Sequence, residues 1–273
     1  MVGQPQRSAL QRHRPYRVLA LAFALSLLAS PVTAADVPPC RMGDEVVAYD
    51  GGRWGHLVID TWWRLSSAYA PNDLVSVRRA HVSGSGKVRA FLIDDLSALA
   101  ADARASGIHL AVQSAYRSYT AQASTFRQWV RKIGPDRASK TSARAGHSEH
   151  QLGTAIDFKS PGGSAPWHNY PRWERTPISR WLAANAWRHG FVLSYPKGTY
   201  QTTCYAYEPW HYRYVGHDAA QAIQQSGQPP RVWLLTNPSP SQSPQPTPTT
   251  EPAVQLTAEA TAEPSPAPST QSP

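Results

Sequence analysis

Two short segments of this sequence carry imidazole and carboxylate side chains at spacings that suit a metal site. In the first, His150 stands seven residues before Asp157, which falls on an expected strand. In the second, Glu208 and His211 flank Pro209 and a tryptophan, and because proline excludes a helix, the two side chains must converge through an extended turn. Hydrolytic zinc sites use three N or O ligands, an open position for water and a nearby carboxylate base. The four side chains meet that requirement.

A guanidinium group completes this set. Arg117 follows directly after an expected strand at residues 108–114. A planar, permanently charged fork suits a substrate carboxylate or the oxyanion that develops during hydrolysis. Each piece alone is weak evidence, since the chain has 10 histidines and a lone His is more often an ordinary surface or core residue. The function prediction therefore depends on their conjunction.

That conjunction resembles the zinc D-alanyl-D-alanine carboxypeptidases of the vancomycin-resistance (VanY-like) type. The likeness in order and spacing extends from about residue 60 to about residue 216. One difference is visible, because Ala115 stands where the family usually has Gly; it can narrow the pocket but removes no functional group. The similar segments are Ser-Ala-Tyr-Arg-Ser-Tyr (114–119), Gly-His-Ser-Glu-His-Gln-Leu-Gly-Thr-Ala-Ile-Asp-Phe (146–158), Gly-Phe-Val-Leu-Ser-Tyr-Pro (190–196) and Glu-Pro-Trp-His-Tyr-Arg-Tyr-Val-Gly (208–216).

The resemblance implies a role for each residue. The family's Ser-x-His-x-x-Gly-x-Ala-x-Asp pattern supplies two metal ligands, which fall on His150 and Asp157. Its Glu-x-Trp-His pattern supplies the base and the third ligand, which fall on Glu208 and His211. One zinc ion per chain and a substrate-binding Arg117 are also implied, and a His₂Asp set suits zinc best among common ions.

Alternatives within these motifs stay open. His147 could be the ligand instead, although the family spacing favours the histidine three residues later. Glu149 is interpreted as a carboxylate that supports the site rather than as the base, and Trp210 as a packed wall. By resemblance, Ser148 and Gln122 bind substrate, unless they only hold loops in place. The other histidines interpreted as solvated or capping residues are His168, His189 and His217.

The implied reaction is hydrolysis of the terminal D-Ala-D-Ala bond of peptidoglycan stem peptides. Arg117 would hold the terminal carboxylate, while Glu208 takes a proton from the attacking water and delivers it to the leaving amine. Two other interpretations stay open. One is a zinc endopeptidase that cuts elsewhere in peptidoglycan peptides, and the other is a non-catalytic module that binds the cell wall.

The two ends of the chain differ in composition from its middle. The first 34 residues contain four arginines and no acid, and an apolar run at 18–28 leads to small residues. This order is typical of a secretory signal cut after Ala34 or Ala35; the alternative, an uncleaved anchor, needs an apolar run of about 20 residues. Residues 237–273, rich in Pro, Ser and Thr, are expected to form a disordered tail. Residues 35–236 are then one globular, carboxypeptidase-like domain.

Composition and charge narrow the partners. With 41% hydrophobic residues and 10 Trp, the chain can bury a core, and its net charge of +9 favours an anionic polymer. The export signal and the lack of a nucleic-acid-binding motif point to the cell envelope rather than to nucleic acid. We expect a secreted or envelope-bound monomer without a membrane span after signal cleavage. Export also favours a disulfide between Cys40 and Cys204 over two free thiols.

Hydrophobic periodicity predicts three helices and several short strands. The first helix presents Leu92, Leu96, Leu99 and Ala103 on one stripe. Helices that cluster early, with strands that do not alternate regularly, favour an α+β fold: a small antiparallel sheet flanked by helices. The second expected helix presents Phe126, Trp129, Val130 and Ile133 on one side, and the third has Thr176 as N-cap and Gly190 past its end. The expected helices are 88–106, 120–133 and 177–189. The expected strands are 108–114, 154–158, 191–195 and 212–215.

Overall fold

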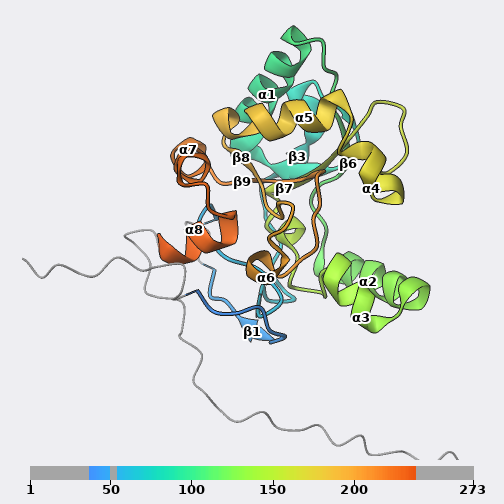
Figure 1. Cartoon of the computed structure of the whole chain (residues 1–273), viewed down its shortest axis with the longest axis vertical. Helices are drawn as coiled ribbons and strands as arrows, with labels where there is room; N and C mark the ends of the chain where they lie inside the picture. The colour runs from blue at the N-terminus through green and yellow to red at the C-terminus, as the bar shows by residue number, and fades with distance from the viewer. Residues whose placement is uncertain (1–36, 50–53, 238–273) are drawn as a thin grey trace, which may run out of the picture. The chain divides into compact units, whose positions relative to one another are not determined.

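A five-stranded sheet forms the centre of the fold (Figure 1). Four of its strands pair antiparallel, and only the edge pair β4–β6 is parallel. The α+β expectation is therefore confirmed, with one parallel pair added at the edge. The strands, in spatial order, are β4 (Ser83–Gly84), β6 (Ala111–Ser114), β7 (Ala155–Lys159), β9 (His211–Tyr214) and β8 (Phe191–Leu193).

This computed structural model describes residues 37–49 and 54–237. The expected signal at 1–34 and nearly all of the expected tail at 237–273 lie outside these residues. Within the described ranges, no helix combines the length and the apolar character that crossing a membrane requires.

Two small two-stranded sheets lie outside the central one. β1 (Glu45–Val46) pairs in parallel with β2 (Trp63–Arg64), and β3 (Leu74–Ser76) pairs antiparallel with β5 (Lys87–Arg89). The second pair corrects the first predicted helix, which was expected to begin at 88. Val88 is fully buried within this ladder, so pairing with β3 overrides the helical stripe, and α1 begins only at Ile93.

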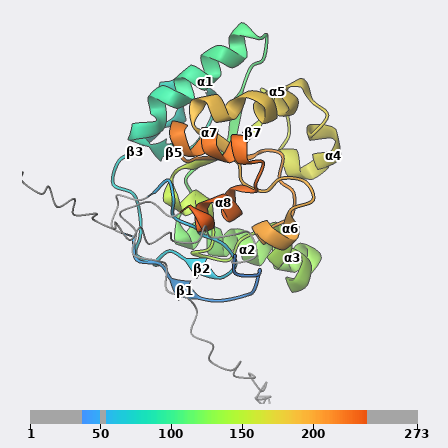
Figure 2. The same cartoon turned by 60° about the vertical axis from the view of Figure 1, so that its left-hand side comes forward.

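Two helices cover one face of the central sheet. Helices α1 and α5 lie on the same side of it (Figures 1 and 2), and their apolar side chains share one core with those of the strands. Leu96 and Leu182 are fully buried there against Ile156 and Phe158. Burying a side chain of this size stabilises the fold by about 1.5–3 kcal/mol. The α-helices are α1 (Ile93–Ala105), α2 (Tyr119–Ile133), α3 (Pro135–Thr141), α4 (Tyr170–Trp173), α5 (Pro177–Asn185), α6 (Tyr200–Thr203), α7 (His217–Ser226) and α8 (Pro230–Thr236).

The ends of the third predicted helix follow its sequence signals. The hydroxyl of Thr176 accepts a hydrogen bond from Ser179 N at 3.2 Å, and Pro177 occupies the first turn of α5. After Asn185 the helix continues as a 3-10 helix to residue 189, and Gly190 follows with φ of 80°. Only glycine adopts that angle without strain, so it ends the helix where the sequence predicts.

Alternation along the two middle strands separates the core from a polar face. On β7, Ile156 and Phe158 enter the core while Asp157 points to the opposite face. On β9, Tyr212 enters the core, so His211 shares the face of its cross-strand partner Asp157. The pleat of two adjacent strands thus places an imidazole beside a carboxylate.

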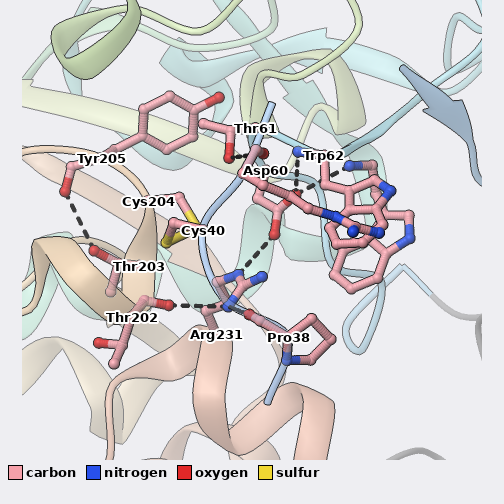
Figure 3. A network of polar contacts seen from close by, with 12 residues as sticks. Pro38, Cys40, Asp60, Thr61, Trp62, Thr202, Thr203, Cys204, Tyr205 and Arg231 are labelled. Atoms are coloured by element: carbon pink, nitrogen blue, oxygen red, sulfur yellow. Dashed lines mark hydrogen bonds and ion pairs between the residues drawn. A yellow bond between two sulfur atoms is a disulfide. The ribbon is translucent and has the colours of Figure 1, made fainter. Parts of the chain in front are cut away.

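A buried ion pair joins Asp60 to Arg231 on the last described helix (Figure 3). Nε of Arg231, on α8, donates to Asp60 Oδ2 at 2.6 Å, and its Nη1 donates to the carbonyls of Pro38 and Thr202 at 3.1 Å each. Asp60 and Arg231 are only 2% and 6% exposed. The structure joins Cys40 and Cys204 in a disulfide beside this pair. This clasp, made of the Asp60–Arg231 pair and the neighbouring disulfide, therefore joins four stretches of chain that are distant in sequence.

Breaking this ion pair should destabilise the whole domain. Arg231→Met leaves the Asp60 carboxylate buried without its partner, and loss of one member of a buried pair costs about 3–5 kcal/mol. Chemical denaturation would measure the free energy of unfolding. The matched control is Lys197→Met: its partner is Glu174, but the Lys197 side chain is 71% exposed, so the loss should stay below about 1 kcal/mol. Equal losses in the two variants would contradict this account of Arg231.

Candidate metal centre and active site

The structure brings the three predicted metal ligands together. Asp157 and His211 are cross-strand partners on β7 and β9, and His150 comes from the 3-10 helix Glu149–Leu152. Their candidate ligand atoms all lie within 4.8 Å of one another, and each residue is 3% exposed. Residues 61 positions apart in the chain thus form one buried cluster of two imidazoles and a carboxylate.

Hydrogen bonding fixes which nitrogen of His150 faces the cluster. Its Nδ1 lies 2.7 Å from the carbonyl oxygen of Ala115. A carbonyl can only accept, so Nδ1 carries the proton and the lone pair of Nε2 points to Asp157 Oδ2, 3.2 Å away. Burial lowers the pKa of His150, helped by the charge of Arg117, so the neutral imidazole that a metal requires is favoured.

Glu149 fixes the orientation of His211 in the same way. Its Oε2 lies 2.9 Å from Nε2 of His211, which leaves Nδ1 facing Asp157 Oδ1 at 3.1 Å. Arg213 donates to the other carboxylate oxygen of Glu149 at 3.0 Å, and Ser194 donates to Oε2 at 2.6 Å. Burial alone would raise the pKa of Glu149, but Arg213, His211 and Ser194 together lower it to about 2. Glu149 is therefore an ionised hydrogen-bond partner of His211.

Two distances within the cluster are close to those between neighbouring ligands of a tetrahedral metal ion. Ligand atoms about 2.0–2.2 Å from one zinc ion lie roughly 3.3 Å apart. The two imidazole nitrogens lie 3.2 and 3.1 Å from the oxygens of Asp157. Burial by itself raises the pKa of the Asp157 carboxyl, yet His150 and His211 lower it well below its usual range. Burial lowers the pKa of His211, but Asp157 and Glu149 raise it to about 10, so this pocket attracts positive charge.

Glu208 lies beside the cluster rather than in it. His211 N donates to the Glu208 carbonyl at 3.0 Å, which closes a turn over Pro209 and Trp210, as the proline predicts. Oε2 of Glu208 is 3.7 Å from Nδ1 of His211, and the side chain keeps 18% exposure. Burial is the main reason why the pKa of Glu208 rises to about 8, with Asp157 adding to the effect. A carboxylate in this place can exchange protons with a water in the cavity.

Arg117 reaches the cavity from the end of β6. A bulge between Val112 and Ser114 shifts the register, so that Ser114 pairs with Asp157. Nη2 of Arg117 donates to Ser114 Oγ at 2.7 Å and lies 3.7 Å from Asp157 Oδ2. Nη1 donates to Gln122 Oε1 at 2.8 Å. The guanidinium is thereby held at the edge of the cluster.

Two residues expected to bind substrate also support other site residues. Gln122, 1% exposed, accepts from Arg117 and donates to the Ala143 carbonyl at 2.6 Å. The hydroxyl of Ser148 accepts from His150 N at 3.3 Å and caps the 3-10 helix that carries this ligand. Both line the cavity, so their side chains hold its walls in place as well as facing it.

Three other histidines named from the sequence, whose side chains the structure describes, lie outside the cluster. Nδ1 of His147 is 2.7 Å from the Asp60 carbonyl, so this alternative ligand faces the clasp instead. His189 contacts Asp102 at 3.1 Å and His217 contacts Asp95 at 2.8 Å, both as polar partners near the surface. The side chain of His168 lies outside the described part of the chain.

One cavity of about 100 Å³ collects these groups. Much of its wall is formed by aromatic residues to which the sequence motifs assign no chemical role. Trp210, expected to be a packed wall, is 7% exposed and meets Trp167 edge-on with ring centroids 6.3 Å apart. The sequence does not indicate Trp129 and Tyr205 as site residues. Trp129 fits the apolar side of a predicted helix, and Tyr205 lies in no recognised motif. The residues that line this cavity include Arg117, Gln122, Trp129, Ser148, His150, Asp157, Trp167, Tyr195, Tyr205, Glu208, Trp210 and His211.

The chain is similar to one protein family and to four curated proteins. The family model described as VanY: D-alanyl-D-alanine carboxypeptidase matches residues 85–217. YodJ of Bacillus subtilis (strain 168) is 34% identical over 174 residues, which are 62% of this chain and 63% of YodJ. The chain spans less than two thirds of the length of each of the four curated relatives it matches, from 33% to 64%.

Two solved structures share the fold. The structure of the LdcB LD-carboxypeptidase superposes with a TM-score of 0.58 at 30% identity, covering 69% of this chain and 92% of LdcB. A mutant of the vancomycin resistance D,D-pentapeptidase VanY from a VanB-type cassette, in complex with Zn(II), gives a TM-score of 0.57 at 27% identity. It covers 66% of this chain and 99% of that one. The relative with a zinc ion and this chain with its His-Asp-His cluster therefore share one fold.

Proposed function

Because the chain belongs to the VanY family of D-alanyl-D-alanine carboxypeptidases, we propose that it is a secreted zinc metallopeptidase. Its reaction is hydrolysis of the terminal D-Ala-D-Ala bond of peptidoglycan stem peptides. The observation that carries this proposal is the gathering of His150, Asp157 and His211 beside Glu208 and Arg117 in one cavity. A metal cluster alone would suit many functions, whereas a free carboxylate and a guanidinium beside it suit hydrolysis of a peptide that ends in a carboxylate.

His150, Asp157 and His211 would hold one zinc ion per chain. When bound, this ion polarises the scissile carbonyl and lowers the pKa of the attacking water. The Zn(II) complex of the VanY relative supports zinc as the metal. The chain's own contribution is to present Nε2 of His150 and Nδ1 of His211 towards Asp157, through the carbonyl of Ala115 and the carboxylate of Glu149.

Arg117 binds the terminal carboxylate of the substrate. Its guanidinium has five N–H donors, of which Ser114 and Gln122 take two. The remaining donors are free to form the two parallel hydrogen bonds that a carboxylate accepts. Because Arg117 lies at the edge of the cluster, a substrate anchored there places the last peptide bond beside Glu208.

Glu208 acts as general base and then as general acid. Its carboxylate takes a proton from water as the water attacks the carbonyl carbon, and it returns this proton to the nitrogen of the leaving D-Ala. The partly exposed position of Glu208, in contact with His211 but outside the ligand cluster, supports this role.

The location of the protein follows from the substrate. Peptidoglycan stems lie outside the cytoplasmic membrane, and residues 1–34 then serve as the export signal, ahead of a carboxypeptidase domain at 35–236 and the Pro/Ser/Thr-rich tail at 237–273. The mature protein works as a monomer on stem peptides in the cell envelope.

A synthetic pentapeptide that ends in D-Ala-D-Ala tests this function directly. We expect the purified protein to release one D-alanine, detected as a loss of one residue by mass spectrometry. A chelator should abolish release and added zinc should restore it. Cleavage inside the peptide would instead identify an endopeptidase, and zinc binding without any cleavage would identify a wall-binding module.

The likeness to LdcB favours a second candidate, an L,D-carboxypeptidase that removes the last D-alanine from a tetrapeptide. That substrate also ends in a D-alanine carboxylate, so Arg117 and Glu208 would have the same roles. The two activities differ in the residue before the scissile bond, which is D-Ala in one and an L-configured centre in the other. The same assay with the matching tetrapeptide separates them by the ratio of the two rates.

Glu149→Gln should weaken zinc binding about 10–100-fold, because the amide cannot hold Nε2–H of His211 as a carboxylate does. Chelator competition would measure the affinity, independently of turnover. The matched control is Glu174→Gln, which also removes a carboxylate charge but lies outside the ligand cluster. If Glu149→Gln bound zinc as tightly as the unaltered protein, the orienting role of Glu149 would be wrong.

A further inference from the structure

A second and larger cavity opens directly beside the active site. It has a volume of about 620 Å³ and shares Trp129, Trp167, Glu208 and Trp210 with the first cavity. Residues of helices α2 and α4 contribute to its lining. The two cavities therefore adjoin at the proposed base.

The order of lining residues gives the direction in which a substrate would run. Arg117 lines only the first cavity, and Glu208 lines both. If the terminal carboxylate binds at Arg117 and the scissile bond lies at Glu208, the rest of the peptide leaves through the second cavity. An extended chain advances about 3.3–3.6 Å per residue, so the third residue of a stem pentapeptide lies about one such step beyond the residue that carries the scissile carbonyl.

The walls of the second cavity suit an aliphatic side chain. Trp129 and Ile133 come from α2, and Trp167, Trp210 and Tyr207 face them from other segments. Trp129 and Ile133, on the side of α2 that the sequence presents as apolar, are only half-buried because they border this cavity and not the core. Aromatic walls pack well against a methylene chain.

The charged residues of this cavity favour an anion. Glu174 is already occupied: Lys197 Nζ lies 3.1 Å from its carboxylate, and the Tyr207 hydroxyl also hydrogen-bonds to it. Arg175 lines the cavity, is exposed, and makes no ion pair with any carboxylate of residues 37–49 and 54–237. Lys197 and Glu174 offset each other, and the second carboxylate of the lining, Glu208, lies where the two cavities meet. The open guanidinium of Arg175 suits a carboxylate.

We infer that this cavity binds the third residue of the stem peptide and selects a diaminodicarboxylic acid, such as meso-diaminopimelate, over L-lysine. The methylene chain packs against the aromatic walls and the distal carboxylate pairs with Arg175. L-Lysine has the same chain length up to its ammonium group but no distal carboxylate. Both side chains carry an ammonium group at this position, so the selection depends on the distal carboxylate and its pairing with Arg175. This inference rests on the proposed function, since it names the substrate class of the same active site.

Two pentapeptides that differ only at the third residue test the inference. Each ends in D-Ala-D-Ala, and kcat/KM for D-alanine release is measured for both on the same zinc-loaded preparation. The ratio of the two values cancels differences in folding or metal content. We expect a ratio of at least about 10 in favour of meso-diaminopimelate, which corresponds to about 1.4 kcal/mol, the scale of one charge-assisted hydrogen bond.

Variants identify the residue responsible. Arg175→Met should reduce the ratio to about 3 or less, because it removes the group that pairs with the distal carboxylate. The control Arg180→Met removes an exposed arginine of α5 that does not line the cavity, and should keep the original ratio. A ratio near 1 in the unaltered protein, or one that Arg175→Met leaves unchanged, overturns the inference while the function stands. Release from neither peptide overturns the proposed function as well.

Discussion

Glu208→Gln is expected to bind zinc normally and to lose about 10²–10⁴-fold in kcat. The amide keeps the size of the side chain but cannot take a proton from water. Retention of metal follows because Glu208 lies beside the cluster of His150, Asp157 and His211 and contributes no ligand atom to it. Turnover of the pentapeptide and zinc content per chain, measured on one preparation, give the two readouts.

A matched control separates this effect from a general loss of negative charge. Glu45→Gln removes an exposed carboxylate of β1 and should leave both kcat and zinc content unchanged. If the Glu208 variant turned over at the unaltered rate, the base would have to be another group. If it lost its zinc instead, Glu208 would be a ligand and the assignment of the cluster would be wrong.

His150→Ala should lose both the metal and the activity. It removes one of three ligands, so the loss of zinc affinity should exceed the roughly 10–100-fold that removal of a supporting residue costs. Titration of the metal-free protein with zinc in a competing chelator measures the affinity. Circular dichroism of the same sample shows whether the fold is intact.

The neighbouring histidine provides the control for this second prediction. His147→Asn keeps a side-chain N–H that can donate to the Asp60 carbonyl, and it should bind zinc like the unaltered protein. The sequence alone leaves the choice between His147 and His150 open. A result in which the His147 variant lost zinc and the His150 variant kept it would reverse the assignment.

The features that sequence predicts well are those with local signals. Thr176, Pro177 and Gly190 mark the ends of a helix because capping depends only on neighbouring residues. The alternation around Asp157 predicts a strand, and the turn required by Pro209 is present. The two site motifs also meet in space, since adjacent strands β7 and β9 carry them.

The features that sequence misses depend on distant partners. Val88 reads as part of a helix until β3 pairs with it. Arg213 supports Glu149 from 64 residues away, and Arg231 holds Asp60 from 171 residues away. Nothing local distinguishes such an arginine from a solvated one. The apolar side of α2 was likewise unpredictable as a cavity wall, because periodicity shows only that a face is apolar and not what it borders.

The bond between Cys40 and Cys204 has a practical bearing on all these assays. It closes a loop of 164 residues, for which chain entropy predicts a contribution of up to about 5 kcal/mol, and its second cysteine adjoins Tyr205 in the cavity wall. Recombinant protein made in a reducing cytosol, or stored with a thiol reagent, would lack this tether four residues ahead of Glu208. Periplasmic production and reductant-free buffers are therefore the appropriate conditions, and truncation beyond Cys40 should be avoided.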